Sequence, residues 1–202
     1  IESKFANGMR ITDEKSIDII EMVLGGLINK DIVNTITSLG GKAVGLSGKD
    51  GGLIRAKKIE GEGEFKNIDF KNTGTVKSID PGVVKLLDGS TFIPVIAPIG
   101  VNKYGNFLNI NADVVAGRIA ESLKAEKLIL LTDIKGILDD NNKLISKIST
   151  RKGRRLIKTK IIQGGMTPKL LAALEAKKNG VKSCHIIDGR LPHAVLLEVL
   201  TA

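Results

Sequence analysis

Hydrophobic positions along the chain recur at two periods, one typical of strands and one typical of helices. Residues 92–101 form an apolar run rich in β-branched residues, short enough to be a buried strand. Helical spacing follows at Val114, Val115, Ile119 and Leu123. Further strands are expected at 127–133 and 183–188, and further helices at 170–178 and 192–200. This alternation predicts an α/β fold, a three-layer α/β/α sandwich with a mainly parallel central sheet.

The N-terminal half shows the same periods with one departure. A capped helix is expected after Asp13, with helical spacing again at 34–39 and an end at Gly40 and Gly41. A strand follows at 43–46. Residues 53–56 and 75–77 then alternate like exposed strands around a polar segment, so we expect a protruding β-hairpin with a long loop. Asp80 and Pro81 indicate a short helix that reaches Leu87.

Composition narrows the class of protein. With 202 residues, 42% hydrophobic and 26% charged, the chain suits one α/β domain with a full core. The single cysteine, Cys184, cannot form an internal disulfide, and there is neither a membrane-span-length apolar run nor a signal-peptide pattern. We therefore expect no membrane partner and a cytoplasmic location, or the plastid stroma in a photosynthetic eukaryote. Because the chain begins at Ile1 and stops after a helix-like pattern, we also expect both ends to be missing.

The net charge of +9 raises the question of nucleic-acid binding, since residues 151–155 read Arg-Lys-Gly-Arg-Arg and lysines follow. Most other lysines are scattered, and aromatic residues make up only 3% of the chain, which leaves little surface for base stacking. We favour a solvated basic face and expect no nucleic-acid partner. A third interpretation, a basic entrance that attracts anionic substrates, ranks between nucleic-acid binding and a solvated basic face.

Polar residues are concentrated where predicted strands meet helices. Asn109, Asn111 and Asp113 stand at one such junction, and Thr132 and Asp133 end the next predicted strand. Ligands of open parallel sheets bind at the carboxyl ends of strands, against helix N-termini. The alternative for the first group is an N-cap and a first-turn partner of the helix dipole. Three polar residues within five exceed what one cap requires, so we favour a ligand site.

Three other segments have candidate binding chemistry. Arg10 follows a loop signal and has a guanidinium that matches a carboxylate, although it also fits an ordinary exposed arginine. The glycine-rich residues 47–52 could approach a phosphate, but a tight turn explains them equally well. Lys169 stands in the first turn of a helix after Gly164 and Gly165, where a cation opposes the helix dipole unless a phosphate faces it.

Taken together, six motifs in order resemble the acetylglutamate kinases, enzymes of arginine biosynthesis with the amino-acid kinase fold. The motifs are Asn-Gly-Met-Arg-Ile-Thr-Asp at 7–13, Gly-Leu-Ser-Gly-Lys-Asp-Gly-Gly at 45–52, Asn-Ile-Asn-Ala-Asp at 109–113, Leu-Thr-Asp-Ile-Lys-Gly at 131–136, Gly-Gly-Met-Thr-Pro-Lys at 164–169 and His-Ile-Ile-Asp-Gly-Arg at 185–190. The resemblance covers all 202 residues. It implies phosphorylation of the side-chain carboxylate of N-acetyl-L-glutamate by ATP, with Mg²⁺ carried by the nucleotide and no separate metal site.

The resemblance also implies a role for each candidate residue. Arg10 would clamp the α-carboxylate of the substrate, and Asn109 and Asn111 would bind its acetylated end and main chain. Lys169 would stabilise the transferring phosphoryl group, and Asp113 would orient the catalytic lysines. The nucleotide would contact Thr132, Asp133, Gly136, Gly164, Gly165 and Met166. Such a site fits phosphoryl transfer, which requires positioning and cations on the phosphate oxygens and needs no covalent nucleophile.

Two departures from the resemblance keep other functions open. The family's first glycine-rich loops and second catalytic lysine would precede Ile1, so we expect the residues in hand to be an inactive fragment. The basic segment at 151–160 stands where the family is usually less charged. A related kinase with another acceptor, of the glutamate 5-kinase or carbamate kinase type, is one alternative, although Arg10 and the paired asparagines argue against it. A non-catalytic ligand-binding regulatory chain is the other.

The resemblance finally implies partners and regulation. The family forms homo-oligomers, dimers or hexamers, and some members bind a PII-type nitrogen signalling protein. Members inhibited by arginine share the 45–52 pattern and a helix in which Glu follows His by five residues, as Glu198 follows His193 here. Glu198 is therefore a candidate arginine-binding residue, the alternative being an exposed glutamate on a surface helix.

Overall fold

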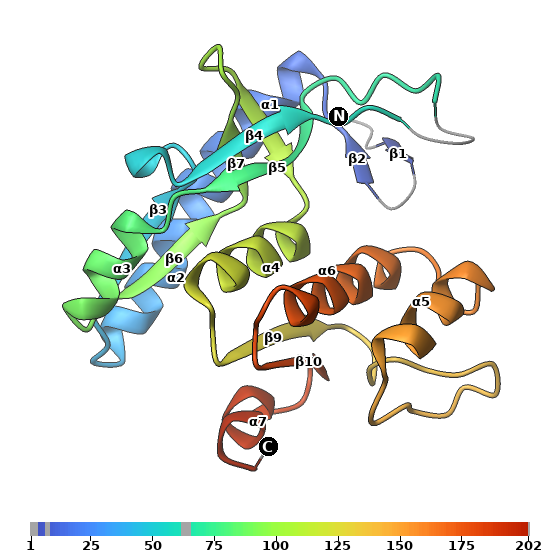
Figure 1. Ribbon diagram of the computed structural model, residues 1–202. Helices are drawn as coiled ribbons and strands as arrows, with labels where there is room; N and C mark the ends of the chain where they lie inside the picture. The colour runs from blue at the N-terminus through green and yellow to red at the C-terminus, as the bar shows by residue number, and fades with distance from the viewer. Residues whose placement is uncertain (1–3, 7–8, 62–65, 202) are drawn as a thin grey trace. The chain divides into compact units, whose positions relative to one another are not determined.

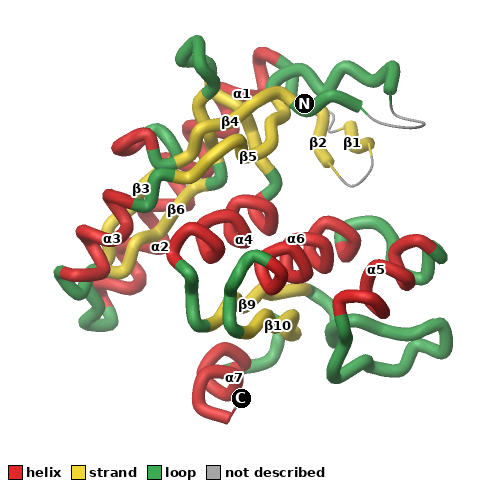
Figure 2. Tube along the Cα trace, in the orientation of Figure 1, coloured by secondary structure: helices red, strands yellow, loops and turns green. Residues whose placement is uncertain are grey.

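In a computed structural model that describes residues 4–6, 9–61 and 66–201, the chain divides into two compact units (Figure 1). The first is Ile1–Leu123 and the second is Lys124–Ala202. Each unit has its own strands and helices (Figure 2). Each unit also has its own buried cluster of hydrophobic side chains. Asn7 and Gly8, which open the first sequence motif, lie outside the described residues.

The first unit opens with a short antiparallel hairpin and a long helical stretch. The hairpin is β1 (Lys4–Ala6) with β2 (Met9–Ile11), and the stretch is α1 (Glu14–Ile20), η1 (Glu21–Ile28) and α2 (Asn29–Ser38). Asp13 caps α1 by accepting a hydrogen bond of 2.7 Å from the Ser16 amide, and Gly40 after α2 adopts a φ of 89°. Both ends agree with the prediction. The spacing did not reveal that η1 is a π-helix, because apolar residues occur on several of its faces.

A parallel pair of strands follows, joined by a long excursion of the chain. β3 (Ala43–Ser47) pairs with β6 (Ile93–Ala97), while η2 (Asp50–Gly52), β4 (Ile54–Lys58), β5 (Thr73–Ile79) and α3 (Gly82–Gly89) lie between them in sequence. The apolar run at 92–101 was predicted as one strand, and this is wrong. It forms β6 and β7 (Ile99–Val101), separated at Pro98, because β6 pairs with β3 whereas β7 pairs with β4 and β8.

The remaining strands of the first unit close into a barrel in the order β4, β5, β8, β7, where β8 is Phe107–Ile110. β4 and β5 pair antiparallel, as predicted, but they are not exposed strands. Leu53, Ile54, Ala56 and Val76 are all buried in the cluster that also receives Val115 of α4 (Ala112–Leu123). The prediction of exposed strands holds only for the outward-facing side chains of β4 and β5. Their inner face forms the core of the unit.

The second unit contains the parallel pair β9 (Lys127–Thr132) and β10 (Ser183–Asp188), with α5 (Thr150–Lys158), α6 (Met166–Lys178) and α7 (Ala194–Thr201). Its core is the buried set Ile137, Leu156, Ile162, Leu170 and Leu174. The parallel pairs in both units confirm the predicted α/β class. Helix α5 was not predicted, because its sequence is mostly charged and few of its side chains are apolar.

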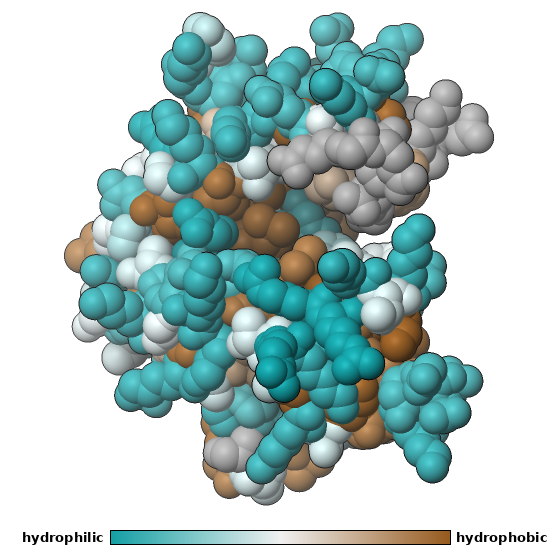
Figure 3. Space-filling model, turned by 45° about the vertical axis from the view of Figure 1, so that its right-hand side comes forward, coloured by the Kyte–Doolittle hydropathy of each residue, from teal (hydrophilic) through white to brown (hydrophobic). Residues whose placement is uncertain are grey.

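Charge and aromatic residues are divided unequally between the units. The first has 15 Lys and Arg against 15 Asp and Glu, whereas the second has 16 against 7, so the second carries the whole net charge of +9. All five Phe and the single Tyr belong to the first unit. The surface is mixed, with hydrophobic side chains exposed among hydrophilic ones (Figure 3). Among the described helices none is both long enough and apolar enough to cross a membrane.

Candidate active site

The first unit contains Arg10, the candidate carboxylate clamp. It lies at the middle of β2, opposite Phe5 of β1 in the hairpin register. The guanidinium carbon of Arg10 is 5.1 Å from the centre of the Phe5 ring, within the range of a cation–π contact. Arg10 is exposed.

Asn111 stands between β8 and α4, and it is the N-cap that the alternative interpretation described. Its Oδ1 accepts hydrogen bonds from the backbone amides of Asp113 at 3.0 Å and Val114 at 3.2 Å. This capping satisfies two amides that the first turn of a helix otherwise leaves unpaired. Asp113 lies in the first turn of α4, where the helix dipole favours a carboxylate. The cap uses Oδ1 and leaves the Nδ2 group of Asn111 for other partners.

Asn109 lies on β8 and is tied to Arg10 through two buried threonines that the sequence did not indicate. The Nδ2 group of Asn109 donates to Thr12 Oγ1 at 3.0 Å. Thr12 Oγ1 lies 3.1 Å from Thr73 Oγ1, and the Thr73 hydroxyl donates to the backbone oxygen of Arg10 at 2.5 Å. The exposed fraction is 0% for Thr12 and 3% for Thr73. Two of the predicted substrate-binding residues are thus joined by one hydrogen-bonded chain.

In the second unit, β9 and β10 end side by side and bring two polar residues together. Thr132 and Asp188 are register partners, and the amide of Gly189 donates to the Thr132 carbonyl at 2.8 Å. Asp133 follows Thr132 and is exposed. Gly136 has a φ of 130°, and a Cβ there would come within 2.9 Å of Leu144, so only glycine suits this turn. Both predicted strands are confirmed, although β9 ends at Thr132, one residue before the predicted end.

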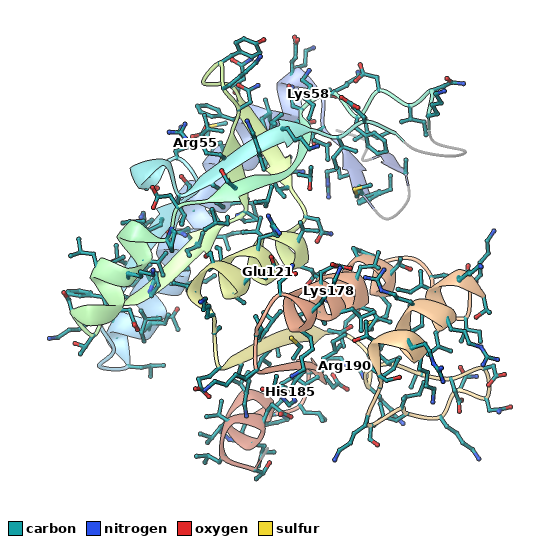
Figure 4. All side chains as sticks on the ribbon, in the orientation of Figure 1. Arg55, Lys58, Glu121, Lys178, His185 and Arg190 are labelled. Atoms are coloured by element: carbon teal, nitrogen blue, oxygen red, sulfur yellow. The ribbon has the colours of Figure 1, made fainter. Side chains whose placement is uncertain are left out.

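Asp188 forms an ion pair with Arg190 at this strand edge, and it was not among the predicted site residues. Arg190 donates to it from Nε and from Nη2, both at 2.8 Å, and the Arg190 amide donates at 3.0 Å (Figure 4). These bonds from Arg190 lower the pKa of Asp188 to about 2 against its burial. Asp188 therefore stays ionised and fixes the turn that follows β10. The only sequence signal was the Asp-Gly-Arg triplet at 188–190.

The other predicted nucleotide contacts surround the start of α6. Gly164 has a φ of 57°, and its carbonyl accepts from the Thr167 amide at 3.2 Å. Gly165 precedes Met166, the first residue of the helix, and no side chain caps this end. Lys169 is the fourth residue of α6 and is half-buried. The unpaired backbone amides of such a helix start are attractive to an anion.

The glycine-rich segment after β3 has the geometry of a tight turn, one of its two interpretations. The Ser47 amide donates to Asp50 Oδ2 at 2.6 Å, and Gly51 and Gly52 have φ values of 59° and 68°. Gly48 is buried, and its amide donates to the Ile99 carbonyl at 2.9 Å. The glycine in this position allows a close approach of two backbones.

Glu198, the candidate regulatory residue, lies on α7 and contacts His185 of β10. Glu198 Oε1 is 2.6 Å from His185 Nδ1, and the side chains are 19% and 25% exposed. It is therefore not the exposed surface glutamate of the alternative interpretation. Lys127 Nζ donates to the Glu198 backbone oxygen at 3.0 Å, which ties the helix to β9 as well.

The candidate residues of the first unit thus offer a guanidinium and two carboxamides, and those of the second unit offer the backbone amides of a helix start. Such a set suits transfer of a phosphoryl group, in which positioning and charge do most of the work. The chain matches the amino acid kinase family over residues 1–188 and belongs to it.

Curated relatives make the comparison more specific. The chain is 56% identical over 203 aligned positions to an acetylglutamate kinase of Nitrosomonas eutropha, covering 99% of this chain and 69% of that protein. It is 54% identical over 206 positions to an acetylglutamate kinase of Halorhodospira halophila, with 99% and 69% covered. The resemblance stated from the motifs is confirmed.

Solved structures agree with the fold. A Streptococcus mutans protein superposes with a TM-score of 0.84 at 28% identity, covering 93% of this chain and 74% of that one. N-acetylglutamate synthase from Neisseria gonorrhoeae, in complex with coenzyme A and N-acetyl-glutamate, gives a TM-score of 0.85 at 22% identity, covering 99% and 45%. At that identity the second likeness concerns the fold alone.

Proposed function

We propose that the protein phosphorylates the side-chain carboxylate of N-acetyl-L-glutamate with ATP, in arginine biosynthesis. The observation that carries this proposal is the identity of 52–56% to acetylglutamate kinases along nearly the whole chain. The hydrogen-bonded link between Arg10 and Asn109 favours an acceptor with both a carboxylate and an amide. Carbamate has no such pair of groups, and glutamate has an ammonium in place of the amide.

On the acceptor side, Arg10 binds the α-carboxylate in this proposal. A planar guanidinium can donate two parallel hydrogen bonds to a carboxylate, which a lysine cannot do. Asn109 and Asn111 contact the acetamido group and the main chain of the substrate with their carboxamides. The capping bonds of Asn111 hold its side chain in one orientation before any ligand arrives, so binding costs less conformational entropy.

On the nucleotide side, we assign the phosphates to the amides of Gly164, Gly165 and Met166, and the rest of the nucleotide to the turn from Thr132 to Gly136. Lys169 supplies positive charge to the phosphoryl group in transfer, and Asp113 orients the lysine side chains of the site. Mg²⁺, when bound, neutralises charge on the phosphate oxygens and keeps most of its ligands as water and phosphate. The resemblance to acetylglutamate kinases is the reason for placing the ion on the nucleotide.

We further propose that the protein is a homo-oligomer of the cytoplasm. Apolar side chains of the helical stretch in the first unit are exposed, among them Met22 and Leu27 at 63% and 61%. Burying such side chains is the usual driving force for association of subunits. A PII-type nitrogen signalling protein is proposed as a further partner on the resemblance alone.

The activity is tested with the complete protein, ATP, Mg²⁺ and N-acetyl-L-glutamate, by following acyl phosphate formation. Lys169→Ala is expected to lower kcat by about 100-fold or more with little change in either KM, because its charge acts mainly in the transition state. Arg10→Lys is expected to raise KM for the acceptor and leave KM for ATP unchanged. Lys178→Ala, at the exposed end of the same helix α6, is the control for lost charge. No acyl phosphate from the wild-type protein would refute the proposed function.

A further inference from the structure

We infer that Thr12 and Thr73 are positioning residues that fix the Asn109 carboxamide so that its Oδ1 accepts a hydrogen bond from the N–H group of the acceptor substrate. The identity of that acceptor rests on the proposed function. The orientation of Asn109 does not, because it follows from the hydrogen bonds within the first unit.

Counting protons along the chain of hydrogen bonds sets their direction. A hydroxyl has one proton and two acceptor positions. The Arg10 carbonyl can only accept, and it lies 2.5 Å from Thr73 Oγ1, so the Thr73 proton belongs to that bond. Thr73 Oγ1 then acts as the acceptor for the Thr12 amide at 3.1 Å and for the Thr12 hydroxyl at 3.1 Å.

The same count of protons determines the orientation of the Asn109 carboxamide, the last group in this series of hydrogen bonds. With its own proton committed to Thr73, Thr12 Oγ1 can only accept from the Asn109 side chain, 3.0 Å away. The nitrogen of the carboxamide must therefore face Thr12, and a flipped side chain would place two acceptors against each other. An unpaired acceptor in surroundings as buried as these is costly.

The backbone holds the same residues in place. Thr73 and Asn109 are register partners across β5 and β8, and the Asn109 amide donates to the Asn72 carbonyl at 2.9 Å. The Asn72 amide in turn donates to the Thr12 carbonyl at 2.8 Å. A rigid frame of this kind keeps the side-chain bonds short without any contribution from a ligand.

This orientation gives Asn109 a defined chemistry toward a ligand. Its Oδ1 has no donor among the described residues, and its second Nδ2 proton is likewise without an acceptor there. An N-acetylated amino acid offers an amide N–H to the first and a carbonyl oxygen to the second. A site that has a committed acceptor discriminates strongly against an analogue that lacks the donor, because the acceptor is then left unpaired.

The test compares Thr12→Val and Thr73→Val with Thr12→Ser and Thr73→Ser in the complete protein. The valine variants are expected to raise KM for N-acetyl-L-glutamate about tenfold, with KM for ATP within about twofold of the wild type, and the serine variants are expected to stay near the wild type. Thr75→Val is the matched control, because Thr75 lies on the same strand and its hydroxyl has no hydrogen-bond partner among the described residues.

A second substrate isolates the acceptor role of Oδ1. In 2-acetoxyglutarate an ester oxygen replaces the amide nitrogen, so the donor is gone while the shape is kept. The wild type is expected to prefer the amide about tenfold or more in kcat/KM, and Thr12→Val is expected to reduce this ratio toward one. An unchanged ratio in Thr12→Val would overturn the inference.

A measurement without substrate separates this inference from the proposed function. The side-chain amide protons of Asn109, assigned with Asn109→Asp, are followed by nitrogen-15 NMR. One of them is expected to exchange slowly with solvent in the wild type and in Thr12→Ser, and rapidly in Thr12→Val. Rapid exchange in the wild type would refute the fixed orientation even if the kinase activity is present, whereas slow exchange would support it even if another acceptor is phosphorylated.

Discussion

Replacing Gly48 by alanine tests whether the segment after β3 is glycine-rich for packing. A Cβ on Gly48 would lie 2.1 Å from the Ile99 carbonyl oxygen and 2.5 Å from the Ile54 Cβ. Ordinary contacts of a Cβ begin at 3.4 Å, so the two backbones would have to separate by about 1.3 Å. Ile54 and Ile99 are buried residues of β4 and β7, two strands of the barrel, so little space is available for this separation.

The cost can be worked from what that separation would break. Two hydrogen bonds of 2.9 Å join these segments, from the Gly48 amide to the Ile99 carbonyl and from the Ile54 amide to the Gly48 carbonyl. Each contributes roughly 1 kcal/mol, and overpacking a core costs roughly 1–3 kcal/mol. We therefore expect Gly48→Ala to lower the free energy of unfolding by about 3–5 kcal/mol, a large part of the about 5–15 kcal/mol of a typical domain.

Urea denaturation followed by circular dichroism measures this loss. Gly89→Ala is the control, because Gly89 ends helix α3 and no atom lies within 4 Å of the position that its methyl group would take. That variant is expected to be unchanged or up to about 1 kcal/mol more stable. A Gly48→Ala protein within about 1 kcal/mol of the wild type would contradict the packing explanation. A stable variant with weakened ATP binding would instead favour the phosphate interpretation of this loop.

Two further predictions concern the second unit. Arg190→Ala is expected to return the pKa of Asp188 from about 2 toward its ordinary value of 3.8. Because the folded-state pKa is lowered, the Asp188–Arg190 pair stabilises the fold above about pH 4, and this contribution disappears as the pH falls from about 4 to about 2. Carboxyl-carbon NMR titration measures the shift, with Arg154→Ala as the control because it breaks only the exposed pair with Glu175. The second prediction is that Glu198→Ala raises the arginine concentration that half-inhibits the complete enzyme. Glu126→Ala, which removes an exposed carboxylate, is the control and is expected to leave that concentration unchanged. No inhibition of the wild type by millimolar arginine would refute the regulatory role.

The elements with a clear period could be predicted from the sequence. The strand at β9, the helix α6 with its end at Gly180 and the junction at Asn111 follow from spacing, capping and glycine preferences, which act locally. The division of residues 92–101 at Pro98 and the burial of Leu53 and Ile54 do not, because they depend on which strands meet in the barrel. Alternation shows that a strand has two unlike faces and does not show what covers them.

The candidate site shows the same limit. Arg10, Asn109 and Lys169 could be proposed from the sequence because each belongs to a motif with recognisable chemistry. Thr12 and Thr73 were missed, because two threonines 61 residues apart give no signal until the hairpin and the barrel place them together. Asp188 was also missed, since the Asp-Gly-Arg triplet at 188–190 was its only sequence signal and Thr132 lies beside it only when β9 and β10 pair.

The placement of aromatic residues has a practical consequence for spectroscopy. Tyr104 is the only tyrosine, there is no tryptophan, and Tyr104 is 74% exposed between β7 and β8, the strand that carries Asn109. Fluorescence excited in the tyrosine absorption band therefore comes from a single position in the first unit, and the second unit emits nothing. A tryptophan introduced near the start of α6 would be a reporter without background emission from its own unit, and selective excitation at the red edge of the absorption band would separate it from Tyr104.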